Sequence, residues 1–193
     1  MIKYKAEDSE EHCCDSCQLP LDKYLQLGSN QGRRLLVVGE SPADNWLKSG
    51  RAFFTMGGKI VPTGKNFLIN LKQIDSKLDL ENISFTEISK CFVAGNRKKL
   101  HVCAAKTWSH FIEQLNYVQP KLIILLGQKT TEIFNYLAAT SLTLGHIQKV
   151  GISSKKHYIL PLYHPSPLNP KRVKNDVFVK NNRTKIRELL MLH

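Results

Sequence analysis

The feature that most constrains the fold is a short apolar run, Leu35–Val38, which ends abruptly at the Gly-Glu-Ser-Pro sequence of residues 39–42. An uninterrupted apolar run closed by Gly and Pro is typical of a strand that is buried on both faces of a parallel sheet. The residues after such a strand form a loop at its carboxyl end, where open α/β sheets bind their ligands. We therefore expect a functional loop directly after this strand.

The loop after the strand contains both polar and aromatic side chains. Its polar groups are Glu40, Ser41, Asp44 and Asn45. Phe53 and Phe54 follow, an aromatic pair that can line a ligand site or pack in the core, and for Phe54 we favour the core. Polar groups beside an aromatic face suit a flat ligand that forms hydrogen bonds, such as a nucleobase.

Strands and helices alternate along the rest of the chain. The sequence predicts three more strands, at residues 83–88, 121–126 and 157–161. Apolar residues at helical spacing predict helices at residues 64–74, 104–115 and 130–137. This alternation predicts an α/β fold with a central, mostly parallel four-stranded sheet. We expect one domain over residues 1–193, with a flexible start at 1–12 and a basic segment at 171–193 that ends as a helix.

The charge balance indicates a polyanionic partner. The chain carries 28 basic and 16 acidic residues, a net charge of +12. Such an excess favours nucleic acid over the alternative of a merely basic surface. No run is apolar and long enough to span a membrane, and the N-terminus has no apolar signal core. We expect a monomeric protein with no membrane partner, located in the cytoplasm beside the nucleoid.

The five cysteines indicate a metal centre better than a disulfide framework. Cys14 and Cys17 have the two-residue spacer of a chelating pair, and Cys91 and Cys103 can supply two further thiolates. Four thiolates suit zinc or an iron–sulfur cluster. Two alternatives stay open, because Cys13 competes with Cys14 and because the two later cysteines can be buried apolar thiols.

Five motifs in a fixed order resemble a known family. They are GES-P after the first strand, GRAFF downstream, TEISKC at the second strand end, PKLIILLG at the third strand, and YHPSPLNP after the fourth. Together with the cysteines they resemble the iron–sulfur branch, family 4, of the uracil-DNA glycosylase superfamily. The resemblance covers residues 14–172. It implies a three-layer α/β/α fold and an enzyme that flips uracil out of DNA and hydrolyses its N-glycosidic bond.

The resemblance also implies catalytic roles. His164 matches the family histidine and would donate a hydrogen bond to the oxyanion that develops at O2 of the departing base. Glu40, Asp44 or Asn45 would position or polarise the attacking water. The structural alternatives are a turn histidine held by backbone groups at His164 and a helix cap at Glu40. No lysine is placed as a Schiff-base nucleophile, so we expect a monofunctional enzyme.

Further residues are matched to the base and to the DNA. We expect Ser41, Phe53 and Glu87 to contact the base, with Phe53 as the stacking aromatic. Leu168 matches the wedge that enters the duplex, although a core role is an equal alternative. The expected DNA contacts are Ser166, Leu168, Lys171 and Arg172.

Three departures from the family pattern bear on chemistry. Glu87 stands where family members place an asparagine that reads the uracil edge, and an ionised carboxylate only accepts hydrogen bonds. Either burial keeps Glu87 protonated, or the pocket prefers another deaminated base, or the chain is a catalytically silent DNA-binding relative. Ser41 stands where other branches have a water-activating aspartate. The spacer from Cys91 to Cys103 is short, but a [4Fe-4S] cluster held by Cys14, Cys17, Cys91 and Cys103 remains the expected cofactor, with zinc as the alternative.

Overall fold

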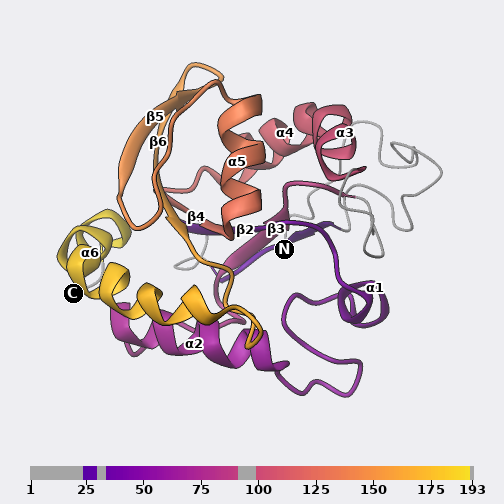
Figure 1. Cartoon of the computed structure of the whole chain (residues 1–193), viewed down its shortest axis with the longest axis vertical. Helices are drawn as coiled ribbons and strands as arrows, with labels where there is room; N and C mark the ends of the chain where they lie inside the picture. The colour runs from indigo at the N-terminus through magenta and orange to yellow at the C-terminus, as the bar shows by residue number, and fades with distance from the viewer. Residues whose placement is uncertain (1–23, 30–33, 91–98, 192–193) are drawn as a thin grey trace.

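A central mixed sheet organises the computed structural model, which describes residues 24–29, 34–90 and 99–191. Its six strands lie in the order β1-β3-β2-β4-β6-β5 (Figure 1). The strands are β1 (Leu25–Gln26), β2 (Leu35–Gly39), β3 (Ser84–Glu87), β4 (Leu122–Leu126), β5 (Gln148–Ile152) and β6 (Lys155–Leu162). The four inner strands are parallel, and β1 and β5 pair antiparallel at the two edges.

Helices cover both faces of the sheet, with α2 and α6 on one side and α3, α4 and α5 on the other (Figure 1). They are α1 (Asp44–Ser49), α2 (Pro62–Ile74), α3 (Lys99–Lys106), α4 (Trp108–Val118), α5 (Gln128–Leu137) and α6 (Lys174–Leu190), and the 3₁₀-helix η3 (Pro170–Val173) precedes α6. No helix among the described residues has the length and apolar character needed to span a membrane.

The apolar run of β2 is continuous because both faces of this strand are covered. Leu35 and Val37 belong to the core between the sheet, α2 and α6. Leu36 and Val38 belong to the core on the opposite face, with Phe111 of α4. Successive side chains of a strand point to opposite faces, so a strand between two helical layers needs apolar residues at every position.

The predicted α/β fold with four parallel strands is confirmed, and the differences lie at its margins. The structure adds the two antiparallel edge strands. The helix predicted at 104–115 is two helices, α3 and α4, which meet at Thr107. The C-terminal helix is longer than predicted, and residues 1–12 lie outside the described part of the chain.

The site is positioned by the parallel strands. Carboxyl ends of parallel strands lie at one edge of a sheet, so the end of β3 and the segments after β2, β4 and β6 converge there. This edge brings together residues that are far apart in the sequence, from Gly39 to Asn169.

Candidate active site

A cavity of about 990 Å³ lies at the carboxyl edge of the sheet. Its wall on the sheet side, here called the sheet wall, is formed by Gly39, Glu40, Phe85 and Glu87. The opposite wall, here called the loop wall, is the segment 163–169, of which His164, Ser166, Pro167, Leu168 and Asn169 line the cavity. Ser41, Asn45 and Phe53 also line it, so most of the predicted site residues share one cavity.

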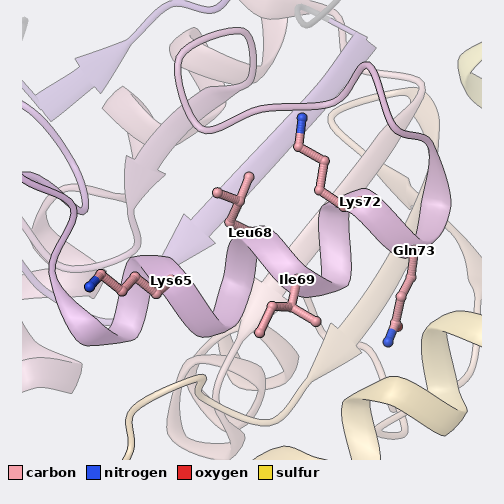
Figure 2. A pocket seen from close by; sticks show the side chains of 5 residues that line it. All are labelled: Lys65, Leu68, Ile69, Lys72 and Gln73. Atoms are coloured by element: carbon pink, nitrogen blue, oxygen red, sulfur yellow. The ribbon is translucent and has the colours of Figure 1, made fainter.

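A second hollow, on the outer face of α2, has a different character. Figure 2 shows its five lining side chains, which all project from that helix, namely Lys65, Leu68, Ile69, Lys72 and Gln73. This lining offers aliphatic carbon, two ammonium groups and one amide, without a carboxylate or imidazole. It therefore lacks the acid–base groups that the cavity at the sheet edge brings together.

The sheet wall places the Glu87 carboxyl against a glycine. Gly39 and Glu87 are paired across β2 and β3. A Cβ added at Gly39 would lie only 2.1 Å from Oε2 of Glu87 and 2.8 Å from its Cδ. The close approach requires glycine at position 39 as long as the carboxyl occupies this place.

Glu87 is buried, with 5% of its surface exposed, and its Oε2 has no hydrogen-bond partner among the described residues. Burial raises the pKa of Glu87 well above its ordinary value; the Lys90 charge opposes this rise and the Glu40 charge adds to it. The side chain of Glu87 therefore ends in an acidic group whose proton is held more tightly than in water.

Lys90 is a fully buried lysine that the sequence interpretation did not single out. Its Nζ donates to Thr86 Oγ1 at 2.7 Å, to Gln114 Oε1 at 2.9 Å and to the main-chain carbonyl of Glu87. Three neutral oxygen acceptors match the three N–H groups of an ammonium. This network anchors the carboxyl end of β3, immediately after the residue that lines the cavity.

On the loop wall, hydrogen bonding defines the tautomer of His164. The backbone N–H of Ser166 donates to Nδ1 of His164 at 3.3 Å. Because Nδ1 accepts, a neutral ring carries its proton on Nε2. The imidazole therefore presents Nε2–H as its donor.

Three asparagines hold the loop wall through neutral hydrogen bonds. Asn175 of α6 is buried and bonds both main-chain groups of Tyr163, accepting from N–H at 2.9 Å and donating to C=O at 2.8 Å. Asn169 donates to the His164 carbonyl at 3.0 Å, and Asn66 of α2 donates to the Pro165 carbonyl at 2.8 Å. The loop that carries His164 is thus fixed from α2, from α6 and from within.

The aromatic and aliphatic residues divide between the cavity and the core. Phe53 lines the cavity, packs edge-on against Phe85 at 5.0 Å between ring centroids, and has a φ of 67°, a left-handed conformation that is uncommon outside glycine. Phe54 is buried in the core, as predicted. Leu168 is 93% exposed at the rim of the cavity, which excludes the core alternative.

Two groups of predicted residues lie away from the cavity lining. Asp44 is exposed on α1 and pairs with Lys48 at 2.6 Å, whereas its neighbour Asn45 lines the cavity. Lys171 and Arg172 lie on η3, next to the loop wall. Arg172 donates to the carbonyls of Pro167 and Asn169 at 3.1 and 3.2 Å, so part of its guanidinium supports that loop.

Of the predicted metal ligands, Cys14, Cys17 and Cys91 lie outside the described residues, as does the competing Cys13. Cys103 is buried on α3 and disulfide-bonded. A sulfur in a disulfide is not a thiolate ligand, so this bond departs from the predicted metal centre, and Cys103 can bind a metal only after the bond is reduced. Among the described residues no cluster of three or more metal-binding side chains is found.

Sequence reasoning missed several lining residues. Trp46 of α1 is buried, its ring is tilted against Phe85 with 5.0 Å between ring centroids, and its Nε1 has no hydrogen-bond partner among the described residues. Lys129 and Glu132 of α5 line the cavity as an ion pair at 3.4 Å. Only the position of α5 directly after β4 could have pointed to the latter two, because helix starts after parallel strands border such sites.

Comparisons with known proteins agree with the motifs. A family profile described as the uracil DNA glycosylase superfamily matches residues 26–188. A type-4 uracil-DNA glycosylase from Archaeoglobus fulgidus is 26% identical over 160 residues, which are 79% of this chain and 76% of the relative. Proteins of the same name from Sulfurisphaera tokodaii and Thermotoga maritima are 24% and 25% identical; the matches cover 80% of this chain in both cases, and 69% and 77% of the relatives.

Proposed function

Because the chain belongs to the uracil-DNA glycosylase superfamily, we propose that it removes uracil from DNA by hydrolysing the N-glycosidic bond and leaves an abasic site. The family expected from the motifs is thereby confirmed. The observation that carries the proposal is the convergence of Glu40, Asn45, Phe53, Glu87 and His164 on one cavity at the carboxyl edge of the sheet.

The proposed chemistry follows from where charge develops. The bond between C1′ of the sugar and N1 of the base breaks with both electrons leaving on the base, so its carbonyl oxygens become negative. His164, with its proton on Nε2, donates a hydrogen bond to O2. Glu40 and Asn45 hold the water whose oxygen bonds to C1′. This water loses a proton, which leaves the sugar neutral, and that proton neutralises the departing uracil anion.

Uracil reaches this cavity only after it has left the base stack. Phe53 provides an aromatic face for the ring, and its contacts with Phe67 and Phe85 hold that face in place. Leu168, exposed at the rim, fills the gap left in the duplex. Ser166, Lys171 and Arg172 contact the phosphates beside it, and Ser41 and Glu87 complete the base pocket.

The proposal includes a [4Fe-4S] cluster in a structural role, held by Cys14, Cys17, Cys91 and Cys103, with zinc as the alternative metal. The cluster would contribute cross-linking of the chain and no step of the hydrolysis. Purified protein should be brown, contain acid-labile sulfide, and lose both properties on Cys103→Ser. Colourless protein with bound zinc would contradict the iron–sulfur assignment.

A base-excision assay tests the proposed function. Labelled single- and double-stranded oligonucleotides carry one uracil, hypoxanthine, xanthine or normal base, and alkali reveals abasic sites. Uracil should be released, and His164→Ala should slow single-turnover release by about 100- to 1,000-fold. His146→Ala, at an exposed histidine before β5, is the matched control.

The other outcomes separate the rival functions. Release of hypoxanthine or xanthine alone would indicate a glycosylase for another deaminated base. Tight DNA binding with no base released would indicate a silent DNA-binding relative. The proposal also expects a monomer located in the cytoplasm beside the nucleoid, and light scattering tests the oligomeric state.

A further inference from the structure

We propose that Glu87 reads the base as a neutral carboxylic acid, donating a hydrogen bond to a ring carbonyl and accepting one from the adjacent ring N–H. The inference rests on the proposed excision of uracil and specifies how its pocket selects the base. It assigns a specificity-determining role to a residue that departs from the family pattern.

The geometry places a single carboxyl where a base edge would meet it. Glu87 ends β3 inside the cavity lining, and its Oε2 is buried without a partner among the described residues. A buried polar atom without a partner is costly, and a rotation of the Glu87 side chain that brings this oxygen to a base in the cavity would give it a partner. The carboxyl lies in the space that a Cβ at residue 39 would fill, so the absence of a side chain at Gly39 makes room for it beside β2.

The protonation state follows from the surroundings of the carboxyl. Lys90 directs its ammonium to three neutral oxygens, including the main-chain carbonyl of Glu87. Burial raises the pKa of Glu87 more than the charge of Lys90 lowers it, and the negative charge of Glu40 raises it further. The other charged or titratable groups that line the cavity are Lys129, Glu132 and His164.

Hydrogen-bond matching then selects the base. Next to each other, uracil presents a carbonyl at C4 and an N–H at N3, and a neutral carboxyl offers one donor and one acceptor at a similar spacing. An ionised carboxylate could accept from N3–H, but its second oxygen would face the C4 carbonyl, also an acceptor. With Glu87 at the C4/N3 edge and His164 at O2, all three polar groups of the Watson–Crick edge of uracil are satisfied.

The test compares pH profiles of the full chain and its Glu87→Gln variant, which keeps a donor and an acceptor but does not titrate. Single-turnover release of uracil by the wild type should fall by about tenfold per pH unit above the raised pKa of Glu87. The rate of the Glu87→Gln variant should not change with pH over the same range, because its amide does not titrate. Any loss caused by ionisation of uracil itself affects both proteins equally and cancels in the comparison.

Infrared spectroscopy of the protein without DNA gives a second, independent readout. A carbonyl stretch of a protonated carboxyl should be present at neutral pH, vanish in Glu87→Gln, and persist in Glu81→Gln, a variant at an exposed glutamate. Absence of this band, or identical profile shapes for two active proteins, would overturn the inference. If the Glu87→Gln variant releases no uracil, the infrared band alone tests whether Glu87 is protonated.

The two proposals fail in different ways. A wild type that releases no uracil would refute the proposed function, whereas the infrared band reports on Glu87 regardless of activity. Release of uracil without the band would leave the proposed function intact and refute only the neutral carboxyl.

Discussion

The sheet wall and the loop wall face the same cavity but hold their polar groups by different means. On the sheet wall, the buried carboxyl of Glu87 packs against Gly39, and the Lys90 ammonium donates a hydrogen bond to the main-chain carbonyl of Glu87. On the loop wall, His164 is positioned by hydrogen bonds between neutral groups, with Asn66, Asn169 and Asn175 as donors or acceptors. The sheet wall is therefore sensitive to shape and to loss of the Glu87 proton, and the loop wall is sensitive to the loss of single amide contacts.

This difference has a physical origin. A strand end in a two-sided core has little freedom, so van der Waals contact is enough to fix a side chain there. A loop has no such packing, and its main-chain groups must find side-chain partners. Substitutions on one wall at a time should therefore have effects that can be compared.

Among substitutions of residues that only support the two walls, the largest effect is expected on the sheet wall, from Gly39→Ala. The new methyl group would overlap the Glu87 carboxyl and displace it, and misplacement by about 1 Å costs about 100-fold in rate. Single-turnover excision measures the loss. Gly151→Ala on β5, where an added Cβ meets nothing within 4 Å, should leave the rate unchanged. An active Gly39→Ala variant would show that the place of the carboxyl is unimportant.

The loop wall should respond to Asn175→Ala. The change leaves the N–H and C=O of Tyr163 without their partner and should cost about 1–3 kcal/mol in the free energy of unfolding. The rate should fall by about tenfold because His164 loses its fixed position. Urea denaturation and single-turnover kinetics measure the two effects, with Asn181→Ala at an exposed position of α6 as control. Wild-type values for both would contradict the role of this asparagine.

A smaller effect, confined to one substrate, is expected at the rim. Leu168→Ala should slow excision from duplex DNA by about fivefold and leave single-stranded DNA nearly unaffected, because only the duplex has a gap to fill. Met191→Ala, another exposed apolar residue, is the control. Equal losses on both substrates would point to a contact with the base or the strand itself.

The smallest effect concerns the phosphates. Lys171→Gln should reduce the slope of log binding constant against log salt concentration by about one unit, with little change in the choice of base. Fluorescence anisotropy over a salt series measures the slope. Lys156→Gln, on the β5–β6 hairpin, should leave it unchanged, and equal slopes for both variants would place the phosphate path elsewhere.

The sequence predicted β2 and β4 well because each is a continuous apolar run, and the shared direction of the parallel strands brings residues 40 and 164 to one edge. The sequence could not show which of Asp44 and Asn45 lines the cavity. Neighbouring residues on a helix point in different directions, and the packing of α1 determines which of them faces the cavity. Asn175 and Trp46 were missed for a related reason, since their roles depend on contacts with distant segments.

A crystal structure of the wild-type chain with free uracil would test most directly whether both walls bind the same base. The account predicts a ring beside Phe53, with Nε2 of His164 at O2 and both Glu87 oxygens within hydrogen-bond distance of N3 and O4. Uracil bound elsewhere, or in this cavity without a contact to Glu87, would contradict it.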